Sequence, residues 1–209
     1  MQNYNLKEAA KYLAKRDKTL SRIIKINGII NLTPHKKYFI ALLRAIIGQQ
    51  LSMYAANTIN ERFMKYFKNK PEPALILQTE DPILRSLGLS GAKVKYVKDL
   101  SHKIQSGEIS LKGFGKKSNE LIISELTKVH GIGIWSVHMF LIFTLGRLDV
   151  LPHSDLGIRK AIMRNYRLKK MPDENKIHEI AKKNNWHPYY TVASLFLWRS
   201  LNNTPSSKK

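Results

Sequence analysis

The stretch from Leu126 to Ile158 contains two features whose residues could bind a ligand or take part in catalysis. The first is a Gly131-Ile132-Gly133 turn between two apolar segments. Glycines let the backbone adopt positive φ and approach a ligand closely, and the N–H groups that begin a helix suit a phosphate. The second is Asp155, which directly precedes another apolar periodic segment. The stretch therefore combines a candidate binding site for a phosphate backbone with a candidate catalytic carboxylate.

Each of these features also has a purely structural interpretation. A Gly-x-Gly sequence can simply turn the chain between two helices, and on this motif alone that interpretation is favoured. Capping alone would account for Asp155, because Asp is among the best N-cap residues. The two roles of Asp155 are compatible, since a helix N-terminus favours the ionised carboxylate. Such a carboxylate can stabilise a developing cation or orient an attacking water.

The charge of the chain points to a polyanionic partner. There are 36 Lys and Arg residues against 15 Asp and Glu residues, which gives a formal net charge of +21. A surplus of this size attracts nucleic acid through counterion release, and we favour that partner over an anionic membrane or charge that serves only solubility. The chain has no cysteine, which excludes disulfides, thiolate nucleophiles, zinc sites of the Cys type and cysteine-held iron–sulfur clusters.

The sequence indicates no membrane span, and its histidines indicate no metal site. No apolar run reaches the length of a span, and the N-terminal segment is neither a signal peptide nor a clear transit peptide. We therefore expect a soluble, cytoplasmic protein. The seven histidines show no metal-ligand spacing, so we interpret His102, His138, His153 and His178 as surface or packing residues.

The elements that must position these residues are helices. Apolar residues recur at helical spacing along nearly the whole chain, and no alternating strand pattern or fixed-period repeat is present. We predict an all-α fold in which Asn5 caps the first helix, Ser52 caps a helix through Phe67, and Pro71 and Pro73 mark a short connection. Residues 202–209 are predicted to be a flexible tail. Further helices are expected at 20–26, 38–48, 81–87, 92–104, 118–128, 134–145, 156–166, 174–184 and 189–201.

The motifs together resemble a known family. GIGIWSVHMFLIF and LDVLPHSDLGIRKA are similar to the helix-hairpin-helix (HhH-GPD) DNA glycosylase superfamily, within it to the 3-methyladenine DNA glycosylase II branch. The segments YFIALLRAIIGQQLSMYAANTI, LGLSGAKVKYVKDLS and WHPYYTVASLFLWRS agree with this family, so the resemblance covers most of the chain in the family's order. Two positions depart from the family pattern: His130 stands where many relatives have proline, and Tyr190 where the family usually has arginine.

The resemblance implies a role for each candidate site residue. Asp155 would be catalytic. Gly131, Gly133 and Ile134 of the hairpin, at about residues 118–146, would hold the DNA backbone. The carbonyls of Thr127, Val129 and Gly131 would hold a structural Na⁺ or K⁺. The wedge that fills the gap left by a flipped base would be Gln50, with Leu51 as second choice. The base pocket would be lined by Trp135, Tyr38, Met139 and Trp186.

Packing is the alternative interpretation for several of these residues. Apolar neighbours such as Val137 and Phe140 make a core position for Trp135 credible, and Gly48 to Ser52 could be an ordinary turn between helices. Tyr38, Met139 and Trp186 are residue types more often found in a core. The position of Trp135 directly after the hairpin favours the pocket.

Trp135 also bears on the reaction. Bifunctional relatives, which also cut the strand, use a lysine near this point, so the resemblance implies a monofunctional hydrolase that needs no cofactor. A tryptophan face suits the positive charge of alkylated purines such as 3-methyladenine or 7-methylguanine. We expect a monomer that excises such bases from double-stranded DNA. The alternatives are a non-catalytic DNA-binding hairpin protein and a bifunctional glycosylase/lyase.

The resemblance also implies the architecture. We expect two helical lobes with a cleft between them. One lobe would span residues 35–151 and carry the hairpin, and the other would combine residues 1–34 with 152–201. Asp155 would then lie at the junction of the lobes.

Overall fold

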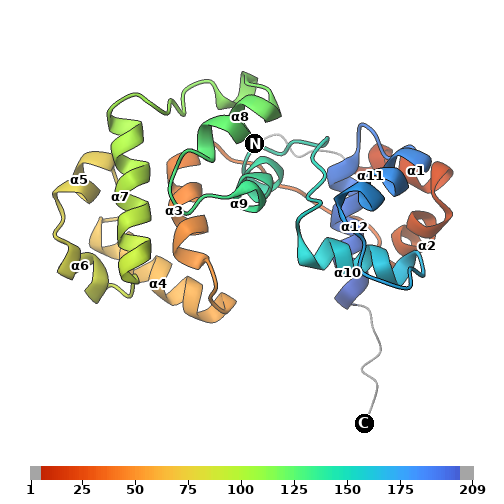
Figure 1. Ribbon diagram of the computed structural model, residues 1–209, viewed down its shortest axis with the longest axis horizontal. Coiled ribbons are helices and arrows are strands. Elements are labelled where there is room, and N and C mark those ends of the chain that lie inside the picture. The colour runs from red at the N-terminus through yellow and green to blue at the C-terminus, as the bar shows by residue number, and fades with distance from the viewer. Residues whose placement is uncertain (1–5, 203–209) are drawn as a thin grey trace, which may run out of the picture. The chain divides into compact units, whose positions relative to one another are not determined.

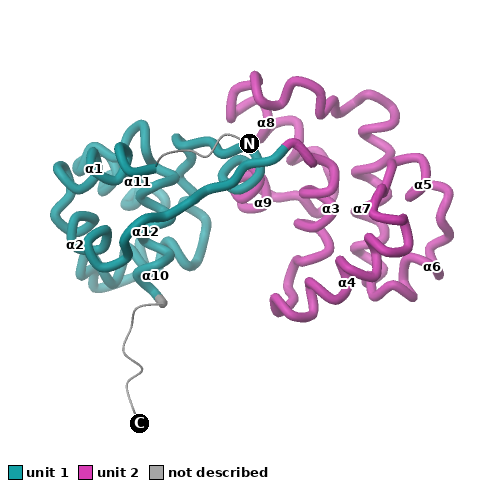
Figure 2. Tube along the Cα trace, turned by 180° about the vertical axis from the view of Figure 1, so that it is seen from behind, with its two compact units in different colours: residues 1–35, 141–209 teal, residues 36–140 magenta. Residues whose placement is uncertain are grey.

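The computed structural model describes residues 6–202, and every regular element in that range is a helix (Figure 1). The prediction of an all-α fold is therefore confirmed. None of the described helices is long and apolar enough to cross a membrane. The chain divides into two compact units, which are residues 1–35 with 141–209 and residues 36–140 (Figure 2).

The first unit is built around its C-terminal helix. That helix, α12, contacts α1, α2 and α10, and the core between them includes Leu13, Leu20, Ile158 and Phe196, which are at most 1% exposed. Its helices are α1 (Leu6–Arg16), α2 (Lys18–Asn27), α10 (Leu156–Asn165), α11 (Glu174–Lys183) and α12 (Tyr190–Asn202). The predicted N-cap Asn5 lies outside the described residues.

The second unit is organised around α7, which contacts α3, α5 and α6. Figure 1 shows α7 between α5 and α3. Its helices are α3 (Tyr38–Gly48), α4 (Met53–Tyr66), α5 (Pro73–Gln78), α6 (Asp81–Ser86), α7 (Gly91–Gln105), a 3₁₀ turn (Phe114–Lys116), α8 (Asn119–Leu126) and α9 (Ile134–Met139). Serine side chains cap α4, α7 and α8, as the hydrogen bonds to the backbone of their first turns show.

Two expected elements differ from the structure. The short connection predicted at Pro71 and Pro73 contains helix α5, which has Pro73 in its first turn, where a missing N–H costs nothing. Its Ile76 is fully buried, and α5 packs against α7, so tertiary contacts stabilise a helix too short to form alone. The helix predicted from 134 to 145 is α9 followed by a π-helical segment, Phe140–Thr144.

The boundary between the two units also differs from the one expected at residue 151, because it lies at residues 140/141. Residues 141–151 are bound to the first unit by specific contacts. The N–H of His35 donates to the carbonyl of Thr144 (3.0 Å), and the hydroxyl of Thr191 donates to the carbonyl of Arg147 (2.7 Å). These bonds attach the segment before Asp155 to the unit that carries Asp155.

Candidate functional site

The hairpin between α8 and α9 uses its two glycines for different purposes. Gly131 has φ +81°, and a Cβ at this position would lie 2.2 Å from the ring of Tyr96 on α7. Gly133 has φ −95° and is the N-cap of α9, and a Cβ there would meet nothing within 4 Å. Positive φ was expected at both glycines but occurs only at Gly131. Gly133 instead leaves the start of α9 open to close approach.

The hairpin turn is fixed from two sides by polar side chains of the same unit. Asp99 of α7 accepts a hydrogen bond from the backbone N–H of His130 (2.8 Å) and lies 3.1 Å from the His130 Nδ1. From the other side, the Gln49 amide donates to the carbonyl of Gly131 (2.7 Å). Proline, which many relatives have at the position of His130, has no N–H and could not make the bond to Asp99. The departure from the family pattern at His130 therefore creates a bond that braces the turn.

Asp99 is a residue that the sequence interpretation missed. Burial acts to raise the pKa of its carboxyl group, but hydrogen bonds from Lys103 (2.8 Å) and from His130 outweigh burial and hold that pKa below 3.8. The i, i+4 spacing of Asp99 and Lys103 could have indicated an ion pair on α7. Nothing in the local sequence indicates that the same carboxylate reaches residue 130.

The backbone carbonyls that the resemblance assigns to a monovalent cation belong to this turn. The carbonyl of Val129 accepts the N–H of Ile132 (3.0 Å), and that of Gly131 accepts the Gln49 amide. A carbonyl oxygen has two lone pairs, so each can still accept a cation. The donor set of neutral oxygens suits Na⁺ or K⁺, and cation binding by Thr127, Val129 and Gly131 stays a prediction.

Beside the hairpin, the second unit has a cavity of about 770 Å³. It is lined by the end of α3, the start of α7 and the start of α9, and it brings together Gln50, Leu51, Gly131, Trp135 and Met139. Trp135 is 45% exposed. This exposure is too large for a core tryptophan and agrees with its predicted place in a pocket.

The predicted wedge residues lie on the rim of this cavity. Gln50 is exposed and has φ +55°, which is unusual for a residue other than glycine. Leu51 is 37% exposed, and Ser52 caps α4 by accepting the N–H of Ala55. The turn is therefore the capped connection between helices that we considered as the alternative. It nevertheless presents Gln50 outward in a strained conformation, and such strain is commonest at functional sites.

Lys93 also lines this cavity. Its ammonium donates to the carbonyl of Ile47 (2.8 Å) near the end of α3, where a cation also interacts well with the helix dipole. Burial lowers the pKa of Lys93 below 10.5. A lysine with a lowered pKa in a pocket is a candidate amine nucleophile, so its role needs a direct test.

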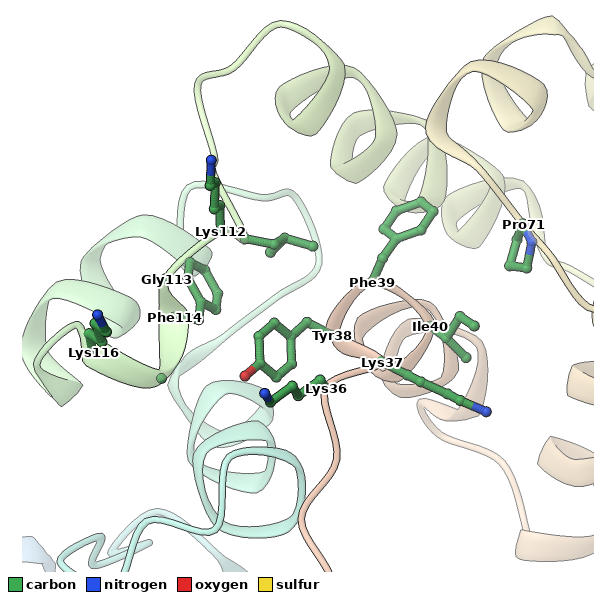
Figure 3. Close-up of a pocket in the computed structure, with 12 residues that line it drawn as sticks. Lys36, Lys37, Tyr38, Phe39, Ile40, Pro71, Lys112, Gly113, Phe114 and Lys116 are labelled. Carbon is green, nitrogen blue, oxygen red and sulfur yellow. The ribbon is translucent and has the colours of Figure 1, made fainter. Parts of the chain in front are cut away.

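Tyr38 was expected to line the pocket with Trp135, but it does not line the cavity beside the hairpin. Tyr38 lines a different cavity of the same unit, of about 680 Å³, where its ring stacks on Phe114 with centroids 6.1 Å apart (Figure 3). Tyr38 begins α3, whereas Gln50 and Leu51 of the hairpin cavity follow the end of α3, roughly 15 Å away along the helix axis. The rim of the Tyr38 cavity carries four lysines, Lys36, Lys37, Lys112 and Lys116.

Trp186 is not a pocket residue either. It is fully buried in the core of the first unit, and its indole N–H donates to Asp17 (2.8 Å). The hydroxyl of Tyr166 donates to the same carboxylate (2.5 Å), and burial together with Asp17 raises the Tyr166 pKa. Asp17 also caps α2, so one buried carboxylate joins three elements of this unit.

Asp155 caps α10 in the first unit. Its Oδ1 accepts the N–H of Ile158 (2.8 Å) and also the indole N–H of Trp198 from α12 (2.8 Å). Phe143 stacks on Trp198, with ring centroids 5.9 Å apart, and is 44% exposed. A Cβ at Gly157 would lie 3.0 Å from both the Asp155 Oδ1 and the Trp198 Cδ1. The carboxylate is thus held in one orientation, with an aromatic surface beside it.

Sequence reasoning missed Trp198 and Phe143. Trp198 lies within the segment WHPYYTVASLFLWRS that carries the resemblance, but only the packing of α12 against α10 shows that it bonds Asp155. Asp155 belongs to the first unit, whereas Trp135, Met139 and the hairpin belong to the second.

Comparison with known proteins defines the class. The HhH-GPD superfamily of base excision DNA repair proteins matches residues 43–186, which is more than half of the chain. The chain therefore belongs to this superfamily, and the resemblance stated from its sequence is confirmed.

Individual relatives are also similar. The chain is 34% identical over 204 residues to DNA-3-methyladenine glycosylase 1 of Schizosaccharomyces pombe, covering 94% of this chain and 88% of that protein. It is 35% identical over 167 residues to YfjP of Bacillus subtilis, of whose length the match covers 58%. Among solved structures, a Schizosaccharomyces pombe 3-methyladenine DNA glycosylase in complex with abasic DNA has a TM-score of 0.84 at 33% identity, covering 96% of this chain and 100% of that chain.

Proposed function

We propose that this protein is a monofunctional DNA glycosylase that removes alkylated purines, of the 3-methyladenine and 7-methylguanine type, from double-stranded DNA. The observation that carries the proposal is the fixed Asp155 carboxylate, bonded to Ile158 and Trp198, in a member of a base excision repair superfamily. The similarity to relatives named DNA-3-methyladenine glycosylases supports the choice of substrate. The enzyme would act as a monomer.

Asp155 would stabilise the charge that develops on the sugar. As the N-glycosidic bond breaks, the base leaves with the bonding electrons and the deoxyribose C1′ acquires oxocarbenium character. A fixed carboxylate lowers the energy of this cation without reorganisation. A water oxygen then bonds to C1′, and its proton passes to Asp155 or to solvent. Because an alkylated purine already carries a positive charge, it leaves as a neutral base and needs no general acid.

Trp135 would stack on the flipped base in the cavity beside the hairpin. Its half-exposed indole offers a π face, and attraction between such a face and a cationic base amounts to about 0.5–2 kcal/mol. Met139 lines the same cavity and would supply a polarisable contact. An undamaged purine carries no positive charge and would lose this attraction. The stacking therefore contributes to selectivity for damaged bases.

The remaining second-unit residues would bind and deform the duplex. Gln50, with Leu51 beside it, would occupy the space that the flipped base leaves in the stack. The open backbone at Gly131, Gly133 and Ile134 would donate N–H groups to a DNA phosphate, and a cation on the hairpin carbonyls would add positive charge there. The net charge of +21 supports a large electrostatic share in this binding.

Asp155→Asn tests the proposal directly. Asn is as good an N-cap as Asp, so the substitution removes the charge while preserving the start of α10. We expect the single-turnover excision rate on a duplex with one 7-methylguanine to fall about a hundredfold or more, with little change in affinity for an abasic-analogue duplex. Asp173→Asn is the matched control, because Asp173 caps α11 in the same way, and it should keep full activity.

Two results would overturn the assignment. One is full excision by Asp155→Asn. The other is a wild-type protein that binds the duplex but excises none of the alkylated purines, which would favour a non-catalytic DNA-binding protein. Such a protein should also bind damaged and undamaged duplexes equally, with a steep salt dependence.

A second candidate function is that of a bifunctional glycosylase/lyase, and it is suggested by the position of Lys93 in the cavity. Its bond to Ile47 supports a structural role for this lysine instead. Borohydride reduction during the reaction traps the Schiff base that a lyase would form. We expect no trapped protein–DNA adduct with wild type, and an adduct that Lys93→Met abolishes would establish the lyase.

A further inference from the structure

Three potential metal ligands meet at one place in the first unit. His153 lies in the turn before α10, and Glu174 and His178 lie on α11. The Nδ1 of His153 is 3.3 Å from one oxygen of Glu174, and the Nε2 of His178 is 3.8 Å from the other. One donor atom from each residue lies within 4.8 Å of the other two.

These separations are close to those that a tetrahedral ion requires. With metal–ligand bonds of about 2.0–2.2 Å, the donor atoms around a zinc ion lie roughly 3.3 Å apart. The longest separation must therefore shorten by at most about 1.5 Å. Glu174 and His178 can supply this movement by side-chain rotation, because their side chains are 59% and 53% exposed. The side chain of His153 is only 18% exposed and provides the fixed ligand.

We propose that His153, Glu174 and His178 form a binding site for one divalent transition metal ion of the zinc class. Two imidazoles and one carboxylate select such an ion over Mg²⁺ or Ca²⁺, which prefer oxygen ligands only. The fourth position would be taken by water.

An alternative reading of the cluster is a pair of histidine–carboxylate ion pairs. Such pairs need each histidine to approach only the carboxylate. Here the donor atoms of all three residues converge, because they all lie within 4.8 Å of one another. An exposed ion pair would also contribute little stability.

The site would connect α11 to the turn that carries Asp155. His153 is two residues before Asp155, and the N–H of Asp155 donates to the carbonyl of Pro152 (3.0 Å). Nearby, Arg159 of α10 donates to the carbonyl of Pro172, just before α11 (2.9 Å). A metal ion would add a stronger link between α11 and the turn and would restrain the turn. Metal binding itself does not depend on the proposed glycosylase activity.

The test is calorimetric titration of the full chain with ZnCl₂ after treatment with EDTA and desalting. We expect one Zn²⁺ per chain and an increase of several degrees in the Tm of the protein on saturation. His178→Gln and Glu174→Gln should each weaken binding at least about tenfold. His102→Gln is the matched control, since His102 is also an exposed helical histidine, and it should bind as wild type does.

Two outcomes would overturn the site. One is the absence of stoichiometric Zn²⁺ binding by wild type. The other is equal affinity in His178→Gln and His102→Gln, which would show that the ion binds elsewhere. Titration with Co²⁺ gives a second readout, because tetrahedral coordination produces intense visible absorption that the His178→Gln variant should lack. Mg²⁺ should neither bind at this stoichiometry nor raise the Tm.

Discussion

Replacing Gly131 by alanine should destabilise the second unit through two separable effects. The φ of +81° at Gly131 is a conformation that costs an L-residue about 1–2 kcal/mol. The added Cβ would also lie 2.2 Å from the Tyr96 Cδ2 and 2.6 Å from the Tyr96 Cγ and Cε2. Overpacking of this kind costs about 1–3 kcal/mol. Gly131→Ala should therefore lower the free energy of unfolding by about 2–5 kcal/mol.

Two comparisons separate these contributions. Gly133→Ala is the matched control, because residue 133 has negative φ and its Cβ would meet nothing within 4 Å. We expect a change of at most about 0.5 kcal/mol, since the weaker N-cap and the lower entropy of the unfolded chain oppose each other. In a Tyr96→Ala background the steric part is gone, so Gly131→Ala should cost only about 1–2 kcal/mol.

Urea unfolding is measured for wild type and for four variants: Gly131→Ala, Gly133→Ala, Tyr96→Ala and the double variant Tyr96→Ala/Gly131→Ala. Circular dichroism follows the helices, and tryptophan fluorescence combines the signal of Trp135, which adjoins the hairpin, with those of Trp186 and Trp198 in the first unit. Equal losses for Gly131→Ala and Gly133→Ala would refute the argument that backbone conformation distinguishes the two glycines. If the cost of Gly131→Ala is the same with and without the Tyr96 ring, the packing of Tyr96 on the turn is not what restricts residue 131.

Three further substitutions test other contacts. Asp99→Asn should destabilise the protein by about 1.5–3 kcal/mol at neutral pH, because it removes a charged acceptor of the His130 N–H. The lowered pKa of Asp99 means that this stabilisation is present above pH 3.8 and is lost as the pH falls through the folded-state pKa, so acid unfolding curves of wild type and variant should converge there. Trp198→Phe keeps a ring beside Asp155 but removes its hydrogen bond (2.8 Å), and in excision assays it should lower kcat roughly tenfold with little change in KM, whereas a purely structural role would leave kcat unchanged. Asp17→Ala leaves a buried indole and a buried phenol without their acceptor, and calorimetry should show a loss of about 2–6 kcal/mol, at about 1–3 kcal/mol for each unsatisfied group.

Local signals were sufficient for most helices. Apolar spacing and the cap residues Ser52 and Asp155 predicted elements that the structure contains, because capping and amphipathic periodicity act over a few neighbouring residues. Helix α5 was missed because two prolines within three residues indicate a connection. Its stability depends on Ile76, which is buried against α7, a contact that no local pattern encodes.

Among the site residues, too, local sequence predicted some positions and missed others. Trp135 follows the hairpin directly in sequence, and the structure places it half-exposed on a cavity. Tyr38 and Trp186 were assigned to the same pocket, but one lies at the far end of α3 and the other in the core of the first unit. Both differences have one physical cause: an aromatic residue suits a core and a pocket equally, and only its neighbours in space distinguish them.

By itself, the sequence determined the helical class, the basic charge, the family and the carboxylate at position 155. These depend on composition and on short-range patterns. Only the tertiary structure decided which groups contact one another. Trp198 bonds Asp155, Asp99 and Tyr96 contact the hairpin turn, and His153 lies beside Glu174 and His178. Each of these contacts joins residues that are far apart in the chain. Such contacts follow from the way helices pack, and helix packing is set by all the side chains of a unit together.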